Sequence, residues 1–132
     1  MATNLARRTE ERPSARGADM PPRDGDRLGK LAGLRDPIRQ AVRAVEPRAE
    51  IILYGSRARG DAGPESDWDL LILVDGPVDG ERKNAIRHRL YEVEWDLDEV
   101  LTSMIFSRED WNSPLYRAMP FHQNVDRDGV PL

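Results

Sequence analysis

LYGSRARGDAGPESDWDLLIL spans Leu53 to Leu73 and joins a glycine-containing turn to two aspartates that lead into an apolar run. Side chains one residue apart on a β-strand point to opposite faces, and those two apart share a face. Asp67 and Asp69 are therefore expected to project from the same side of the strand that continues to Val74. Two carboxylates about 7 Å apart along a strand can hold a hard cation between them.

The Gly55-Ser56 pair predicts an anion-binding turn next to this cation site. It follows the short apolar run Ile51 to Tyr54, where a glycine lets the backbone turn sharply and approach a ligand. Backbone N–H groups at such a turn attract anions. Ser56 adds a hydroxyl donor, and Arg57 and Arg59 add positive charge. Mg²⁺ suits such a site, because it is usually held by one or two carboxylates together with substrate phosphates.

These residues resemble the fingerprint of the minimal nucleotidyltransferases, a family of the DNA polymerase β-like superfamily. The fingerprint places Gly-Ser at a strand end, often continued as Ala-Arg-Gly, and then Ser-Asp-x-Asp-Leu at the start of the next strand. It reads here Gly55-Ser56-Arg57-Ala58-Arg59-Gly60 and Ser66-Asp67-Trp68-Asp69-Leu70. In element order the resemblance extends from about Asp36 to the C-terminus.

The resemblance implies transfer of a nucleoside monophosphate from a nucleoside triphosphate, with ATP as the expected donor, to an acceptor hydroxyl. It implies that Gly55 and Ser56, with Arg57 and Arg59 nearby, bind the triphosphate. Asp67 and Asp69 would bind Mg²⁺, with Mn²⁺ as a substitute. Family members of this size are commonly antitoxins encoded beside a small helical ribonuclease toxin, so the acceptor hydroxyl is expected on such a partner protein.

One feature departs from the family pattern. Active members usually carry a third carboxylate on a later strand, but the matching segment here, residues 100–106, contains no acid. Asp98 and Glu99 lie just upstream and are the candidates for the catalytic base, with a solvated acidic turn as the alternative reading. Without a third acid near the metal, activity would be weak or absent. The chain would then be a catalytically degenerate binding module that docks to a partner.

Composition narrows the other classes of function. A net charge of -4 argues against general binding of nucleic acid, and the lack of cysteine excludes disulfides and thiolate metal sites. No apolar stretch has the length of a membrane span or a signal peptide core, so a cytoplasmic location is expected. An aminoglycoside-type nucleotidyltransferase would need an added substrate domain or a dimer cleft. The sequence leaves the oligomeric state open.

Hydrophobic periodicity predicts the element order α-β-turn-β-α-β-α. This is the order of the family's core, so the resemblance implies an α/β (α+β) fold, a small mixed three-stranded sheet with helices packed on it. Residues 1–27 are rich in Arg, Pro and Asp and predict a disordered tail, with a basic arm that contacts RNA or a partner as the alternative. Residues 28–132 form the expected nucleotidyltransferase domain. The predicted helices cover 28–46, with a break before Pro37, 80–91 and 114–129, and the predicted strands cover 51–54, 67–74 and 100–106. Tyr54, Trp68, His88 and His122 are expected to have structural roles.

Overall fold

The computed structural model describes residues 24–132 of the chain, with side chains from Lys30 onward in the first helix. The chain divides into two units, residues 1–32 and residues 33–132. Helix α3 (Asp24–Val45) begins in the first unit and continues in the second. Of the expected tail, residues 1–23 lie outside the described part, and the last four residues, 24–27, are helical. The boundary expected after residue 27 and the basic arm stay predictions.

Helix α3 corrects the break expected before Pro37, because the helix is continuous through this residue and ends at Val45. A proline inside a helix costs about 3 kcal/mol. Each fully buried Leu, Ile or Val side chain contributes about 1.5–3 kcal/mol. Leu34, Ile38 and Val42 are all buried, so the packing of this helix face outweighs the local penalty of the proline.

Four strands form one mixed sheet in the order β3-β2-β1-β4. They are β1 (Glu50–Tyr54), β2 (Trp68–Val74), β3 (Leu101–Ser107) and β4 (Val130–Pro131). Strand β2 pairs antiparallel with β1 and parallel with β3, and β4 pairs antiparallel with β1. The mixed sheet and its first three strands are confirmed, each strand within one residue of its expected limits. A two-residue strand is too short to leave an alternating pattern, and so β4 was not expected.

The helix that follows β2 is longer than the sequence pattern predicted. Helix α5 runs from Gly80 to Leu97, whereas the expected end was Tyr91. Asp79 caps its start by accepting a hydrogen bond from the backbone N–H of Arg82 at 2.8 Å. The helix ends where Asp98 takes a left-handed conformation with φ of 55°. This ending fixes the direction in which the chain enters β3.

The C-terminal segment forms three short helices, α6 (Arg108–Trp111), α7 (Pro114–Arg117) and α8 (Pro120–Asp128). The predicted capping start is present, since the hydroxyl of Ser107 accepts a hydrogen bond from the N–H of Asp110 at 3.0 Å. The single last helix expected over 114–129 is wrong. Met119 is extended, with φ of −78° and ψ of 140°, because a proline disfavours the helical conformation in the residue before it.

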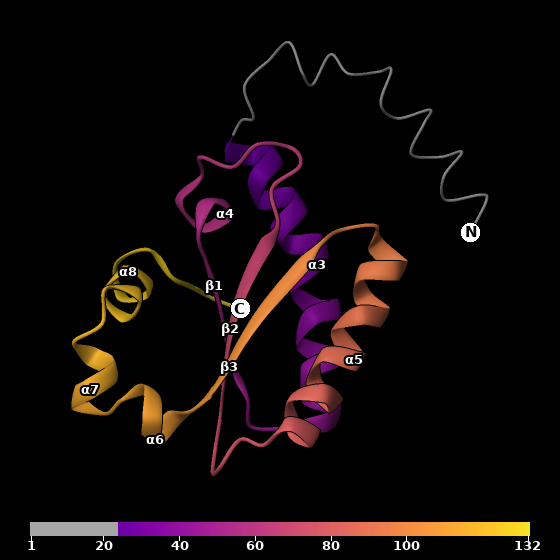
Figure 1. Cartoon of the computed structure of the whole chain (residues 1–132). Coiled ribbons are helices and arrows are strands. Elements are labelled where there is room, and N and C mark those ends of the chain that lie inside the picture. Colours follow the sequence, from indigo (N-terminus) through magenta and orange to yellow (C-terminus); the bar gives the residue numbers. More distant parts are fainter. Residues whose placement is uncertain (1–23) are drawn as a thin grey trace. The chain divides into compact units, whose positions relative to one another are not determined.

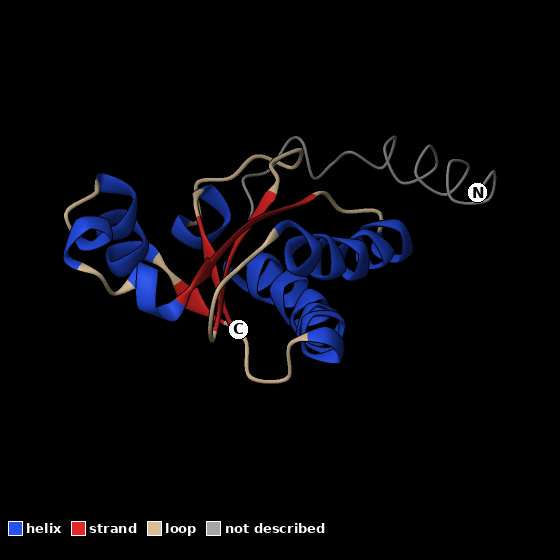
Figure 2. Ribbon diagram, turned by 60° about the horizontal axis from the view of Figure 1, so that its bottom comes forward, coloured by secondary structure: helices blue, strands red, loops and turns tan. Residues whose placement is uncertain are grey.

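Helices cover both faces of the sheet. Helix α5 and the part of α3 from Gly33 onward lie on one side, and α6 to α8 lie on the other (Figure 1, Figure 2). On the second side, Leu71 and Leu73 of β2 belong to a buried cluster that includes Trp111. Asp69 points to the same face as Leu71 and Leu73, because side chains two residues apart on a strand share a direction. The fold therefore puts this aspartate on the face that the C-terminal helices cover.

Within residues 24–132, no helix combines the length and the apolar character that crossing a bilayer requires. The cytoplasmic location expected from the sequence stays a prediction.

The join between α8 and β4 gives a first test of this packing. A Cβ atom added at Gly129 would lie 2.5 Å from the carbonyl oxygen of Val125 and 2.8 Å from Cγ2 of Ile52. We expect Gly129→Ala to lower the free energy of unfolding by about 1–3 kcal/mol, because backbone and core would have to shift. Gly80→Ala is the matched control, since nothing lies within 4 Å of a Cβ there. Urea denaturation measures both, and equal stability of the two variants would contradict the packing.

Candidate active site

The turn at the end of β1 lies directly against one of the two aspartates. Tyr54, the last residue of β1, pairs with Asp69 in the antiparallel register of β1 and β2. A Cβ atom added to Gly55 would overlap Oδ2 of Asp69. Gly55 also has φ of +76°, a conformation that residues with a side chain rarely adopt. Only glycine meets both requirements, and the register of the two strands brings the two halves of the motif together.

Ser56 follows Gly55 and begins the short helix α4 (Ser56–Arg59). The carbonyl oxygen of Gly55 accepts hydrogen bonds from the N–H groups of Ala58 and Arg59, each at 3.0 Å. The turn is therefore closed by its own backbone and does not depend on a ligand for its shape. The phosphate-binding role expected for Gly55 and Ser56 stays a prediction.

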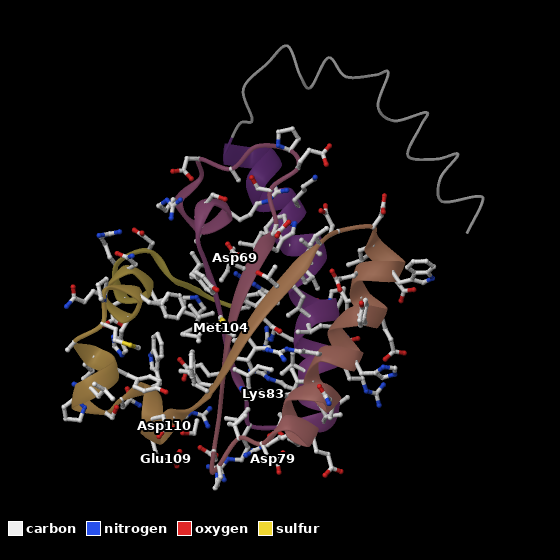
Figure 3. The ribbon with its side chains drawn as sticks, in the orientation of Figure 1. Asp69, Asp79, Lys83, Met104, Glu109 and Asp110 are labelled. Atoms are coloured by element: carbon white, nitrogen blue, oxygen red, sulfur yellow. The ribbon has the colours of Figure 1, made fainter. Side chains whose placement is uncertain are left out.

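Asp69 is held from its other side by β3. In the parallel register Asp69 pairs with Thr102, and Leu71 pairs with Met104. Figure 3 shows Asp69 at the start of β2, near α4, and Met104 on the neighbouring strand. The hydroxyl of Thr102 donates a hydrogen bond to Oδ1 of Asp69 at 2.5 Å. Hydrogen bonds to charged groups contribute about 1.5–3 kcal/mol, so this contact fixes the orientation of the carboxylate.

The acids expected to complete the site do not reach it from β3. The strand starts at Leu101, after both Asp98 and Glu99. Oε2 of Glu99 accepts a hydrogen bond from the indole N–H of Trp68 at 3.2 Å. Trp68 and Asp69 are consecutive in β2 and point to opposite faces. The structure therefore brings Glu99 to Trp68 and not to Asp69, while Asp98 is exposed at the end of α5.

Asp67 is exposed and directly precedes β2. The N–H of Trp68 donates to the carbonyl oxygen of Val100 at 2.8 Å, so pairing with the β3 side begins immediately after Asp67. Its expected common direction with Asp69 follows from strand alternation and stays a prediction.

Arg57 is engaged by the loop that leads to β2. Its Nε and Nη2 atoms donate to the carbonyl oxygen of Ser66 at 3.1 and 2.9 Å, and Nη2 also donates to the carbonyl oxygen of Pro64 at 3.3 Å. Its guanidinium carbon lies 4.4 Å from the centroid of the Trp68 ring, within the range of a cation–π contact. These contacts give Arg57 a structural role in the loop. Its predicted phosphate contact would have to compete with them.

Arg59 is less constrained than Arg57. Its side chain is exposed, and Nε lies 3.2 Å from Oδ2 of Asp61. Exposed pairs of this kind contribute little stability and exchange partners readily. Of the two arginines predicted to bind phosphate, Arg59 is the one that can turn towards a ligand at low cost.

Tyr54 was expected to have a packing role, and its ring does contact that of Phe121 edge-on, with centroids 5.2 Å apart. It also borders the site electrostatically. Burial raises the pKa of the Tyr54 hydroxyl above its ordinary value, and the negative charge of Asp69 raises this pKa further. The hydroxyl therefore stays protonated, and able to donate a hydrogen bond, throughout the physiological pH range.

The histidines lie elsewhere. The ring of His122 is buried and stacks on Trp111, with centroids 4.2 Å apart, and its Nδ1 lies 3.2 Å from Oδ2 of Asp126. His88 is exposed on α5. In the part of the chain that the structure describes, no three side chains of His, Cys, Asp or Glu are grouped closely enough to hold a metal ion.

The donor chemistry at Asp69 fits Mg²⁺. Asp67 and Asp69 supply carboxylate oxygens, the ligand type that this ion prefers, and Mg²⁺ commonly takes only one or two protein carboxylates when a phosphate substrate completes its coordination. Thr102 and the missing Cβ of Gly55 hold the Asp69 carboxylate in one orientation at the turn. Asp67 and Asp69 are therefore the residues that would hold the ion.

A family description of nucleotidyltransferase domains matches residues 35–114. The chain belongs to this family. The matched region contains both halves of the motif, Gly55-Ser56 and Asp67 to Asp69, so the nucleotidyltransferase fold expected from the sequence is confirmed. The nucleotidyltransferase domain matches no curated protein at the level of sequence.

A solved structure described as "Crystal structure of the toxin-antitoxin with AMP-PNP" is similar to this nucleotidyltransferase. The two share 20% sequence identity, with a TM-score of 0.52, over 73% of this chain and 69% of that chain. At this identity the similarity supports the fold alone.

Sequence reasoning missed Thr102 as a neighbour of the candidate metal ligand. In the sequence, Thr102 was considered only as part of the expected strand 100–106, which contains no acid. The signal that could have found it is the parallel pairing of β2 with β3. Aligning the starts of the two predicted strands would have put Asp69 opposite Thr102.

The contacts of Arg57 make its replacement a test of the loop. We expect Arg57→Lys to lower the free energy of unfolding by about 1–3 kcal/mol, because lysine lacks the planar fork that bonds two carbonyl groups and stacks on Trp68. Arg59→Lys is the matched control and should change stability by less than about 0.5 kcal/mol. Chemical denaturation measures both variants. Equal losses would mean that Arg57 does not support the loop.

The raised pKa of Tyr54 gives a test of its proximity to Asp69. Above about pH 10 the unfolded chain releases this tyrosine proton while the folded chain keeps it, so stability should fall as pH rises through that range. Asp69→Asn should lower the pKa of Tyr54, and the exposed Asp61→Asn should not. Ultraviolet absorbance of tyrosinate follows the titration, with Tyr54→Phe identifying the signal. An unchanged titration in Asp69→Asn would contradict the contact.

Proposed function

We propose that this nucleotidyltransferase domain transfers a nucleoside monophosphate from ATP to a hydroxyl group on a partner protein, with Mg²⁺ or Mn²⁺ held by Asp67 and Asp69. The observation that carries the proposal is the packing of Gly55 against the carboxylate of Asp69. The two halves of the motif are thereby neighbours in space. The family match supports a transferase. The similar structure, described as a toxin-antitoxin with AMP-PNP, motivates the choice of ATP and of a protein partner.

In the proposed mechanism the backbone and hydroxyl of Ser56, with the Gly55 turn, bind the β- and γ-phosphates, and Arg59 adds positive charge. When bound, Mg²⁺ offsets charge on the triphosphate and on the pyrophosphate that leaves. Thr102 keeps the carboxylate of Asp69 in the orientation that the turn requires.

The acceptor oxygen attacks the α-phosphorus in line with the bond to the leaving group. That bond breaks, and its electron pair leaves with pyrophosphate. The side chains of β3 that share the face of Asp69 are Thr102, Met104 and Phe106, none of which is a base. The proton of the acceptor hydroxyl therefore passes to water in this proposal, and we expect a slow reaction.

We propose a small helical toxin protein as the partner. The chain is short and carries a net charge of -4, which does not suit a nucleic-acid acceptor because its phosphates would be repelled. A partner protein can supply both the hydroxyl and the acceptor binding surface.

A second candidate function follows from a specific observation. The position opposite Asp69 on β3 is occupied by Thr102, whose hydroxyl is already bonded to the Asp69 carboxylate. A chain with this arrangement can retain the nucleotide pocket while it acts only by docking to its partner. In this case the protein is a catalytically degenerate binding module, and nucleotide binding stabilises the docked form.

Transfer of label separates these two functions. The purified protein is incubated with ATP labelled on the α-phosphate, Mg²⁺ and the candidate toxin, and incorporation into the toxin is measured over a long time course. We expect label in the toxin with the native chain. Asp69→Asn should reduce the rate about 100-fold or more, because losing about 3 kcal/mol of charge stabilisation has this effect. Asp61→Asn, an exposed acid, is the matched control and should transfer normally.

The partner complex is measured with the same proteins. If the toxin binds the native chain and Asp69→Asn equally well, and neither transfers label at any time, nucleotide transfer is wrong and the binding module is correct. If Asp61→Asn loses transfer as fully as Asp69→Asn, the loss does not come from the proposed metal site.

A further inference from the structure

The side of α5 that faces away from the sheet carries two large aromatic side chains. Tyr91 is 70% exposed and Trp95 is 60% exposed, although both are among the residue types that folding usually buries. The opposite side of the same helix is buried through Ile86, Leu90 and Val93. One face of α5 is therefore packed into the core, while the other exposes aromatic side chains to the solvent.

The exposed aromatic residues belong to a regular seam. Asn84, His88, Tyr91 and Trp95 are spaced by four, three and four residues, and all four are exposed. This is the spacing with which one helix packs along another in a coiled-coil arrangement. We call these four residues the α5 seam. A seam of this kind on a single helix indicates a second helix as its occupant.

Beside the α5 seam, basic residues lie towards the N-terminal end of the helix and acidic residues lie towards its C-terminal end. Along one flank of the helix stand Lys83 and Arg87, followed by Glu94 and by Asp98 at the C-cap. The order is basic, basic, acidic, acidic. An antiparallel copy of the same helix would therefore bring Lys83 to Asp98 of the other copy and Arg87 to its Glu94. The pattern is complementary to itself in that orientation.

Two features affect the strength of this pairing. One is an existing contact of Glu94, and the other is the charge on the opposite flank of the seam, which we call the second flank. Oε2 of Glu94 accepts a hydrogen bond from the backbone N–H of Leu101 at 3.0 Å, and a carboxylate has lone pairs for a further partner. The second flank carries Glu81 and Glu92, and Glu92 lies 3.6 Å from Arg89 of its own helix. The first flank therefore supplies the attraction between copies, and the second adds little.

We propose that the α5 seam is a homodimer interface, in which α5 of two copies packs antiparallel about a two-fold axis. In such an interface the same patch serves both copies, and each contact occurs twice. Trp95 packs on Asn84 of the other copy, and Tyr91 packs on its His88. The antiparallel orientation also sets the two helix dipoles in opposition. A partner of another sequence would not require self-complementary charges, and for this reason the second copy is the occupant.

The seam is smaller than a standard interface. Stable complexes bury about 800 Å² on each partner, and one helix face offers less than this. We therefore expect a dimer with a dissociation constant in the micromolar range. Because Arg87 and Asp98 are exposed, and Lys83 and Glu94 are half-buried, added salt should weaken it.

Sedimentation equilibrium tests the seam directly on the full chain. We expect the mass to rise from one copy towards two as the concentration increases from about 1 µM through the micromolar range. Trp95→Glu should abolish the rise. Leu115→Glu is the matched control, since Leu115 is 73% exposed on α7, and it should dimerise normally. A native chain that stays monomeric at every concentration, or an equal loss in the control, would overturn the proposal.

A pair of charge variants tests the orientation and excludes misfolding. Arg87→Glu should stay monomeric, because the introduced carboxylate would face Glu94 of the second copy. Glu94→Lys should also stay monomeric, because the introduced ammonium group would face Arg87 of the second copy. An equal mixture of the two variants should dimerise, since both contacts are then between opposite charges. A mixture that remains monomeric would overturn the antiparallel pairing. The seam does not include Asp69, so these outcomes are independent of the test of nucleotide transfer.

Discussion

The fit between the backbone of Gly55 and the carboxylate of Asp69 is the constraint on which the candidate site depends. It exists because β1 and β2 pair antiparallel with Tyr54 opposite Asp69. A shift of one residue in that register would turn Asp69 to the other face of the sheet. The glycine conformation, the absence of a Cβ atom and the hydrogen bond from Thr102 all act on the same carboxylate. The sheet is therefore the element that builds the site, and the loops complete it.

At the start of β2, the two faces of the sheet carry side chains with different roles. Asp69, with Thr102 beside it, points to the face of the C-terminal helices. Trp68 points to the other face, where it contacts the guanidinium of Arg57 and donates to Glu99. Asp69 therefore belongs to the candidate metal site on one face, while its neighbour Trp68 supports the surrounding loops on the other.

Local pattern was sufficient for the order of the first three strands and the two long helices, α3 and α5, and for the limits of those strands, because apolar alternation and helical periodicity are properties of short segments. It was insufficient wherever distant segments pair. The position of Thr102 depends on the register between β2 and β3, and periodicity inside a segment carries no information on register. The direction of Glu99 depends on the indole of Trp68, and the carbonyl partners of Arg57 belong to a loop whose shape no motif describes. The break at Pro120 was readable from the sequence, because the effect of proline on its predecessor is local.

The close approach of Gly55 to Asp69 has a consequence for how this signature persists during evolution. Both residues are part of the packing between two core strands, so selection for a stable fold alone would preserve them. A homologue that had lost nucleotide transfer would still keep glycine and aspartate at these two positions. Conservation of this glycine and this aspartate among homologues is therefore weak support for catalytic activity. The residue opposite the aspartate on the third strand, which supplies a hydroxyl and no carboxylate in this chain, is the more informative place to look.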